Sequence, residues 1–170
     1  MQCAPDGPDF ATTFSPVTTE AVVVEFLPDD ADRVVQHMRR VLTRRRGWIN
    51  LQPVPQREEE AATTTSIFSG PAPPKLPLCT WKVEDRRGRL ETTVGVQHGA
   101  GTSIAPRLRD VGVTAGPGWR VLQDHRRRGL VVSVPEGEDV RTVLDWLIRA
   151  GNHLSLVETT GRWAAELYDG

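Results

Sequence analysis

A glycine-rich turn is the local feature best suited to chemistry. The run Gly99-Ala100-Gly101-Thr102-Ser103 leaves a predicted strand and opens a predicted helix. Backbone N–H groups in such a turn are free to point at an anion. The run has neither the spacing of a dinucleotide-binding fingerprint nor the Gly-Lys-Ser/Thr of a phosphate-binding loop. The competing interpretation is an ordinary strand-to-helix turn capped by Thr102 or Ser103.

Arginines surround this turn in the sequence and supply the counter-charge for an anionic ligand. One lies on the helix that follows the turn, and three are consecutive in a later polar turn. The planar guanidinium group matches phosphate and carboxylate geometry with paired hydrogen bonds. The predicted ligand-binding residues are Gly99, Gly101, Thr102, Ser103, Arg107, Arg126, Arg127 and Arg128.

Two histidines and an aspartate are the candidates for catalysis. His98 and His125 lie at the ends of predicted strands, and Asp124 precedes the second of them. An aspartate can orient an imidazole for proton transfer, and two imidazoles with a carboxylate can hold a metal ion. No pair of histidines has ligand spacing, so no metal site is predicted. The competing interpretation is a set of exposed side chains beside turns.

The cysteines and serines give little support for nucleophilic chemistry. Cys79 lies in an apolar alternating run, where a buried thiol behaves as a small hydrophobic side chain. Cys3 and Cys79 are too few and too differently placed to suggest a disulfide framework. No Gly-x-Ser-x-Gly elbow is present.

Charge is unevenly distributed along a chain whose net charge is only -1. Residues 82–128 are basic, whereas residues 1–38 and the segment from 129 onward are acidic. The arginine clusters at 39–46, 86–89 and 126–128 could form a surface for RNA, with tryptophans to stack on bases. The favoured alternative is that these arginines are solvated charges on a helix and in turns, so RNA is not the preferred partner.

Two segments have the same plan of apolar strand, proline, acidic cap, amphipathic helix and glycine. In the first, residues 22–26 precede Pro28-Asp29-Asp30, and a helix from Ala31 ends at Gly47. In the other, residues 130–134 precede Pro135 and acidic residues, and a helix runs from Val140 to Gly151. Between them lies a third strand-helix unit, in which glycine and hydroxyl side chains replace the acidic caps.

The remaining elements are predicted from alternation and turn residues. Strands on either side of Arg86-Arg87-Gly88 predict an antiparallel hairpin. A further strand is expected at 119–123, with a polar turn at 124–129. Residues 1–20 read as a loose leader and residues from about 53 to 77 as a mobile connection, with a short edge strand at 63–68. Residues 154–157 and 162–167 are expected to close the chain as a hairpin around Thr159-Thr160-Gly161.

These patterns predict an α+β fold, with a single domain at 21–170. Its mixed or largely antiparallel sheet has seven to eight strands, and three helices pack on it. No apolar run is long enough to span a membrane and no signal peptide is recognisable, so a cytoplasmic location is expected.

The leading functional hypothesis is a non-catalytic binding or interaction protein for an anionic small molecule, a polyanion or a protein partner. The alternative is a small enzyme acting on an anionic or phosphorylated substrate, with His98 or His125 as acid or base. The sequence indicates no cofactor. Trp146 lies off the centre of its helix stripe, which allows a homodimer through that helix.

Overall fold

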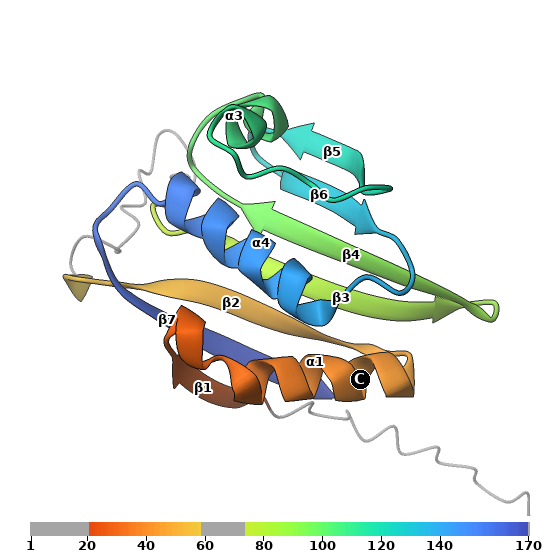
Figure 1. Ribbon diagram of the computed structural model, residues 1–170. Coiled ribbons are helices and arrows are strands. Elements are labelled where there is room, and N and C mark those ends of the chain that lie inside the picture. Colours follow the sequence, from red (N-terminus) through yellow and green to blue (C-terminus); the bar gives the residue numbers. More distant parts are fainter. Residues whose placement is uncertain (1–20, 59–73, 170) are drawn as a thin grey trace, which may run out of the picture.

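The protein is a single α+β domain built on one open antiparallel sheet (Figure 1). The structure, a computed structural model, describes residues 21–58 and 74–169. In this part of the chain seven strands form the sheet in the order β1-β7-β2-β3-β4-β6-β5, and every neighbouring pair is antiparallel. The strands are β1 (Val22–Phe26), β2 (Gly47–Pro55), β3 (Leu78–Arg86), β4 (Arg89–Gln97), β5 (Arg120–His125), β6 (Gly129–Val134) and β7 (Thr159–Asp169). The helices are α1 (Asp32–Arg44), α3 (Ile104–Asp110) and α4 (Val140–Leu154), with a short 3-10 turn at Pro28–Asp30.

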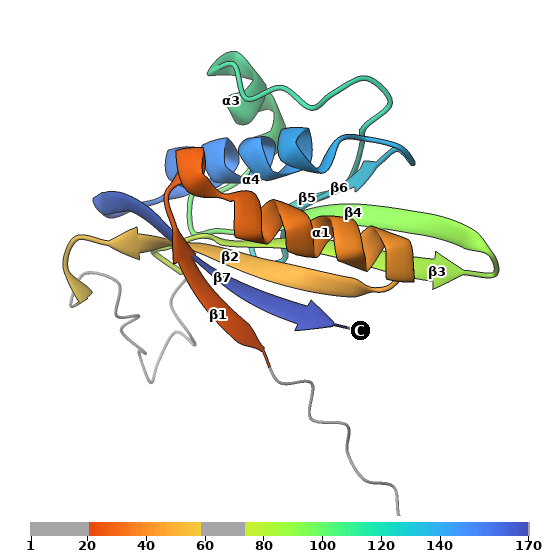
Figure 2. The same cartoon turned by 60° about the horizontal axis from the view of Figure 1, so that its bottom comes forward.

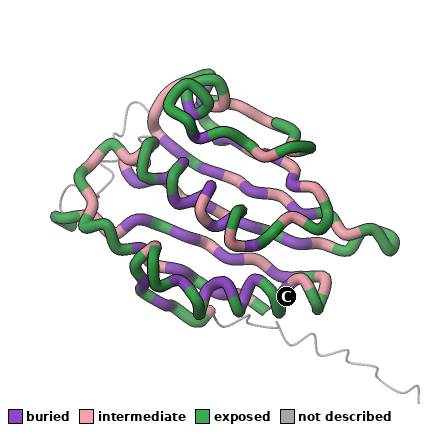
Figure 3. The backbone as a smooth tube through the Cα atoms, viewed as in Figure 1, coloured by how far each residue is buried: buried purple, intermediate pink, exposed green. Residues whose placement is uncertain are grey.

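The core lies between the sheet and the helices α1 and α4, which cover the same face (Figure 2). Buried and less buried residues alternate along the strands, as expected when one face is packed and the other meets solvent (Figure 3). Each helix contributes one apolar stripe to this layer. Buried side chains on the helix-covered face of the sheet include Ile49, Leu51, Trp81, Val83, Val94, Val96, Leu130, Val132, Trp163 and Ala165.

The predicted first strand and helix are confirmed, but the helix ends differ from the prediction. The carboxylates of Asp29 and Asp30 do not cap α1; they lie in the 3-10 turn, and the N-cap of α1 is Ala31, without a side-chain hydrogen bond. Proline fixes the backbone of this turn, so the chain completes one tight turn before α1 begins. At the other end Arg45 is the C-cap in the left-handed region, and Gly47 is already the first residue of β2.

The predicted hairpin between β3 and β4 is confirmed. Arg87 and Gly88, at φ 57° and 81°, form its two-residue turn. Two successive residues with positive φ match the right-handed twist of the paired strands. The carboxylate of Asp85 accepts a hydrogen bond from Gly88 N at 2.8 Å, which fixes the turn further.

The second large helix begins as predicted and ends later. Asp139 caps α4 by accepting a hydrogen bond from Thr142 N at 3.0 Å. Gly151 does not stop the helix, which continues to Leu154. A Cβ atom at position 151 would lie 2.5 Å from the Trp163 ring and 3.0 Å from Cys79 Sγ. The glycine is therefore explained by the close approach of the helix to the sheet.

The prediction of a closing hairpin is wrong. Leu154 belongs to α4, and Thr159–Asp169 is one continuous strand that crosses between β1 and β2. Thr159-Thr160-Gly161 lies at the start of this strand. Strand β7 pairs with β1 on one side and with β2 on the other, so the backbone groups on both of its sides have hydrogen-bond partners without a hairpin.

The long connection begins later than predicted, because β2 continues to Pro55. Strand β3 pairs with β2 only as far as Leu51, and Pro53 and Pro55 pair with β7 alone. Proline is tolerated where one side of a strand has no partner. The predicted leader at 1–20 and the edge strand at 63–68 lie outside the described residues. In the described part of the chain, no helix has the length and apolar character needed to cross a membrane.

Candidate functional site

A bulge in β5 sets the geometry of the candidate site. Val121 pairs with Val132 and Gln123 pairs with Val131, so Leu122 is an extra residue without a partner in β6. An extra residue moves every following side chain to the opposite face of the sheet. Asp124 consequently lies opposite the buried Leu130, on the face covered by helices. It was predicted in a turn, but it is part of the strand.

Asp124 connects β5 to α3 through two hydrogen bonds. Its Oδ1 accepts from Ile104 N at 3.1 Å and its Oδ2 from Ala105 N at 2.9 Å. The two amides belong to the first turn of α3, where N–H groups lack partners within the helix. A carboxylate supplied from another strand therefore caps the helix. Ser103 is the N-cap residue at φ 57° and makes no side-chain cap bond, so the predicted cap by Thr102 or Ser103 is wrong.

The glycine-rich turn before α3 is open to solvent on one side. Gly101 has φ 100°, which other residues rarely adopt, and nothing lies within 4 Å of the position that its Cβ would take. Thr102 and Ser103 are exposed. Arg107 donates from Nη1 to Ala100 O at 2.5 Å, so the first arginine of α3 is attached to this turn.

The three arginines between β5 and β6 are exposed and lie on a fixed backbone. His125 Nδ1 accepts hydrogen bonds from Arg127 N at 3.1 Å and Arg128 N at 3.3 Å. Gln123 Nε2 donates to Arg128 O at 2.9 Å. Figure 1 shows α3 beside the end of β5 that leads into this turn. The turn at 126–128, Arg107 and the turn at 99–103 therefore lie at one end of the sheet, which we call the basic end.

The arginines of the basic end form no ion pair with the carboxylates that the structure describes. Within the described residues, no ion pair involves Arg107, Arg126, Arg127 or Arg128. Some arginines elsewhere on the surface are neutralised locally: Arg44 with Asp169 at 3.0 Å, Arg45 with Asp85 at 2.6 Å, and Arg86 with Glu84 and Glu91 at 3.1 and 3.3 Å. Other exposed arginines, such as Arg33 and Arg39 on α1, likewise form no ion pair among the described residues. The positive charge of the basic end is thus left for an external anion.

The two candidate histidines lie in different surroundings. His98 is only 3% exposed, and neither ring nitrogen has a hydrogen-bond partner in the described part of the structure. Burial lowers its pKa, and Arg107 acts in the same direction, whereas the negative charge of Asp124 opposes the shift. His125 is exposed and uses Nδ1 to fix the arginine turn. The pair shares the same end of the sheet, but one ring is buried and the other is at the surface.

Cys79 is a structural thiol. It is fully buried beneath α4, where burial raises its pKa to about 12 and its Sγ contacts Leu147 O at 3.6 Å. A thiol of this kind carries almost no thiolate at neutral pH. In the described ranges, no three His, Cys, Asp or Glu side chains gather as metal ligands.

An apolar cavity of about 370 Å³ was missed by the sequence analysis. It lies between α3, the segment 111–119, the β5–β6 pair and α4, and its wall includes Leu108, Val132, Trp119 and Trp146. Trp146, which the sequence placed off the centre of its helix stripe, is 7% exposed and packs against Trp119 with ring centres 5.5 Å apart. Its position off the helix stripe was the one signal in the sequence that pointed to this cavity.

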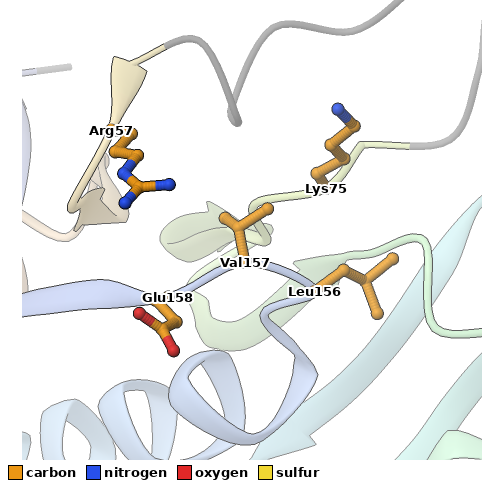
Figure 4. Close-up of a pocket in the computed structure, with 5 residues that line it drawn as sticks. All are labelled: Arg57, Lys75, Leu156, Val157 and Glu158. Carbon is orange, nitrogen blue, oxygen red and sulfur yellow. The ribbon is translucent and has the colours of Figure 1, made fainter.

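A second hollow lies where β7 begins, beyond the end of β2. Figure 4 shows Arg57, Lys75 and Glu158 around it, with Leu156 and Val157 along its floor. The volume is about 800 Å³, and Leu156 is 54% exposed within it. The hollow is a broad, open depression of the surface. Neither it nor the apolar cavity is lined by His98, Asp124 or His125.

Comparison with known proteins gives no relative: no protein family matches the chain, and no match was found among curated proteins or solved structures.

Proposed function

We propose that this protein is a non-catalytic binding protein for a small, multiply charged anion, held at the basic end. The observation that carries the proposal is the group formed by Arg107 and the turn at 126–128, four exposed arginines without a carboxylate partner among the described residues. Each guanidinium offers paired donors that fit a phosphate or carboxylate group. A ligand with several such groups can contact several of these side chains at once.

The backbone of the basic end supports binding because it is already fixed. Asp124 connects α3 to β5, and His125 and Gln123 hold the arginine turn through its backbone atoms. The arginine side chains therefore leave rigid elements, and less conformational entropy is lost when an anion binds. The turn at 99–103 adds the exposed hydroxyl groups of Thr102 and Ser103, whereas the amides of Ile104 and Ala105 are already bonded to Asp124.

The alternative of an enzyme with a histidine acid or base has less support. Both oxygens of Asp124 accept backbone hydrogen bonds, and Nδ1 of His125 accepts two more. His98 is buried away from solvent, which hinders proton exchange with a substrate. Asp124 and His125 are thus engaged in holding the structure that presents the arginines.

Titration with sodium tripolyphosphate tests the proposal. Isothermal titration calorimetry at 50 mM NaCl should show saturable binding that weakens at 200 mM NaCl, because exposed charges are screened by salt. The double substitution Arg127→Gln and Arg128→Gln should weaken binding about tenfold, which corresponds to about 1.4 kcal/mol. Arg33→Gln, an exposed arginine on α1, is the matched control and should change nothing. Equal effects of the two variants, or the absence of binding at 50 mM NaCl, would overturn the proposal.

A further inference from the structure

The cavity beneath the β5–β6 pair is a half-open pocket of about 370 Å³ with a mostly apolar wall. Small-molecule sites begin at about 300 Å³, and a dry apolar cavity of about 150 Å³ already holds benzene. The space suffices for a body of two fused rings.

The wall of the cavity is mostly apolar and partly exposed. Leu108, Leu130 and Val132 are about 1% exposed and form its floor. Val121 pairs with Val132 on the helix-covered face, but it is 52% exposed. A core-facing valine that remains exposed shows that α3 and the segment 111–119 do not close over this edge of the sheet. Apolar surface at the entrance favours an apolar ligand.

Two indole rings give the cavity a preference for flat groups. Trp119 and Trp146 both line it, and their planes are inclined by 53°. Aromatic rings bind other rings by offset or edge-to-face contact. Trp119 Nε1 donates to Glu138 Oε2 at 2.7 Å, so one indole is already satisfied. Trp146 Nε1 is buried and not accessible from the cavity, so this indole meets the cavity with its carbon atoms.

The cavity also has a cationic group in its wall. Arg109 also lines the cavity, is exposed, and forms no ion pair within the described part of the chain. The ligand's negative group belongs at Arg109, because the carboxylate of Glu138 occupies the side of Trp119.

We infer that this cavity binds an aromatic monocarboxylate with a body of about two rings, separately from the basic end. The apolar wall takes the rings, and Arg109 pairs with the carboxylate. Arg109 is not part of the basic end, so this inference does not depend on the proposed function.

Naphthalene-2-carboxylate is the probe that tests the inference. Calorimetry and quenching of tryptophan fluorescence should show saturable binding with one site per chain. Naphthalene-2-carboxamide, which lacks the charge, should bind about tenfold more weakly, the effect of one charged hydrogen bond of about 1.4 kcal/mol. Equal affinity for the two probes would contradict the pairing of Arg109 with the carboxylate.

Two substitutions locate the probe. Arg109→Gln should weaken binding of the carboxylate about tenfold and leave binding of the carboxamide unchanged. Ala105→Leu places a larger side chain in the cavity and should abolish binding of both probes. Arg33→Gln on α1 is the control for Arg109. Circular dichroism establishes that each variant is folded, and because Arg109 is exposed its substitution is compatible with folding.

The inference is overturned if the wild-type protein does not bind the carboxylate saturably. It is also overturned if a folded Ala105→Leu variant binds both probes as tightly as the wild-type protein, because the probes then bind elsewhere.

Discussion

Replacement of Asp124 by alanine should break the hydrogen bonds that join α3 to β5 and lower the stability of the whole domain. The carboxylate accepts hydrogen bonds from Ile104 N and Ala105 N at 3.1 and 2.9 Å, in a partly buried position. Alanine leaves both amides without an acceptor from β5. Unlike an ordinary N-cap, Asp124 is 19 or 20 residues distant in sequence from these amides, so it also closes a loop.

The expected cost follows from the two lost bonds. Loss of one N-cap side chain typically costs about 1 kcal/mol, and hydrogen bonds to a charged group contribute about 1.5 to 3 kcal/mol each. Two such bonds sum to about 3 to 6 kcal/mol, but Asp124 is only partly buried, so water replaces part of each bond and we expect Asp124→Ala to lower the free energy of unfolding by about 2 to 3 kcal/mol. For a chain of this length the loss corresponds to a decrease in Tm of about 4 to 10 °C.

Urea unfolding followed by circular dichroism measures the loss, and Asp139→Ala provides the matched comparison. Asp139 caps α4 locally through one backbone amide, Thr142 N at 3.0 Å, and should cost only about 1 kcal/mol. The reasoning is refuted if Asp124→Ala is no more destabilising than Asp139→Ala. An equal loss would mean that the capping of α3 from β5 adds nothing beyond an ordinary helix cap.

Three further predictions concern the core. Gly151→Ala should lower the free energy of unfolding by about 1 to 3 kcal/mol, measured by urea unfolding, because the new methyl group would lie 2.5 Å from the Trp163 ring. In a variant carrying Cys3→Ser, Cys79 should not react with a thiol reagent at pH 8 until the protein is unfolded, since its pKa is raised to about 12. The free energy of unfolding should decrease as the pH falls below about 6.5, because burial lowers the pKa of His37 and His98 and the unfolded chain takes up protons first. The decrease is at most about 1.4 kcal/mol per pH unit for each histidine.

Each of these predictions has a clear contrary result. Alanine is the better helix former, so a Gly151→Ala variant that gains stability would contradict the close contact with Trp163. Rapid labelling of Cys79 in the native protein would contradict its burial. A stability that is constant between pH 7.5 and 5.5 would contradict the lowered histidine pKa values, since histidines with unshifted pKa values contribute no dependence on pH.

The repeated strand-helix pattern allowed the main elements of the fold to be predicted. The period of the apolar residues in α1 and α4, and the alternation in β3 and β4, reflect burial on one face, which a sequence records directly. Helix ends were less predictable because tertiary contacts decide them. Gly151 has the sequence character of a helix stop, but it is a contact point with Trp163, and only the packed sheet reveals this.

The candidate site was predictable in composition and less so in geometry. The arginines and the glycine-rich turn were identified from residue types, and the structure has them at one end of the sheet. The role of Asp124 was not foreseen, because it depends on the bulge at Leu122, which moves the side chain to the helix-covered face. The cavity beside Trp146 was not foreseen either, since the position of Trp146 off its helix stripe does not reveal an unfilled space between elements.

Mapping of tripolyphosphate onto the protein by nuclear magnetic resonance tests the central claim most directly. At low salt, the backbone amides of residues 99–103 and 126–128 should shift first and saturate with a common affinity. Arginines on α1 that are equally exposed should show no shift at these concentrations. Shifts distributed over all exposed arginines, or confined to α1, would contradict the claim that the basic end is a binding site for anions.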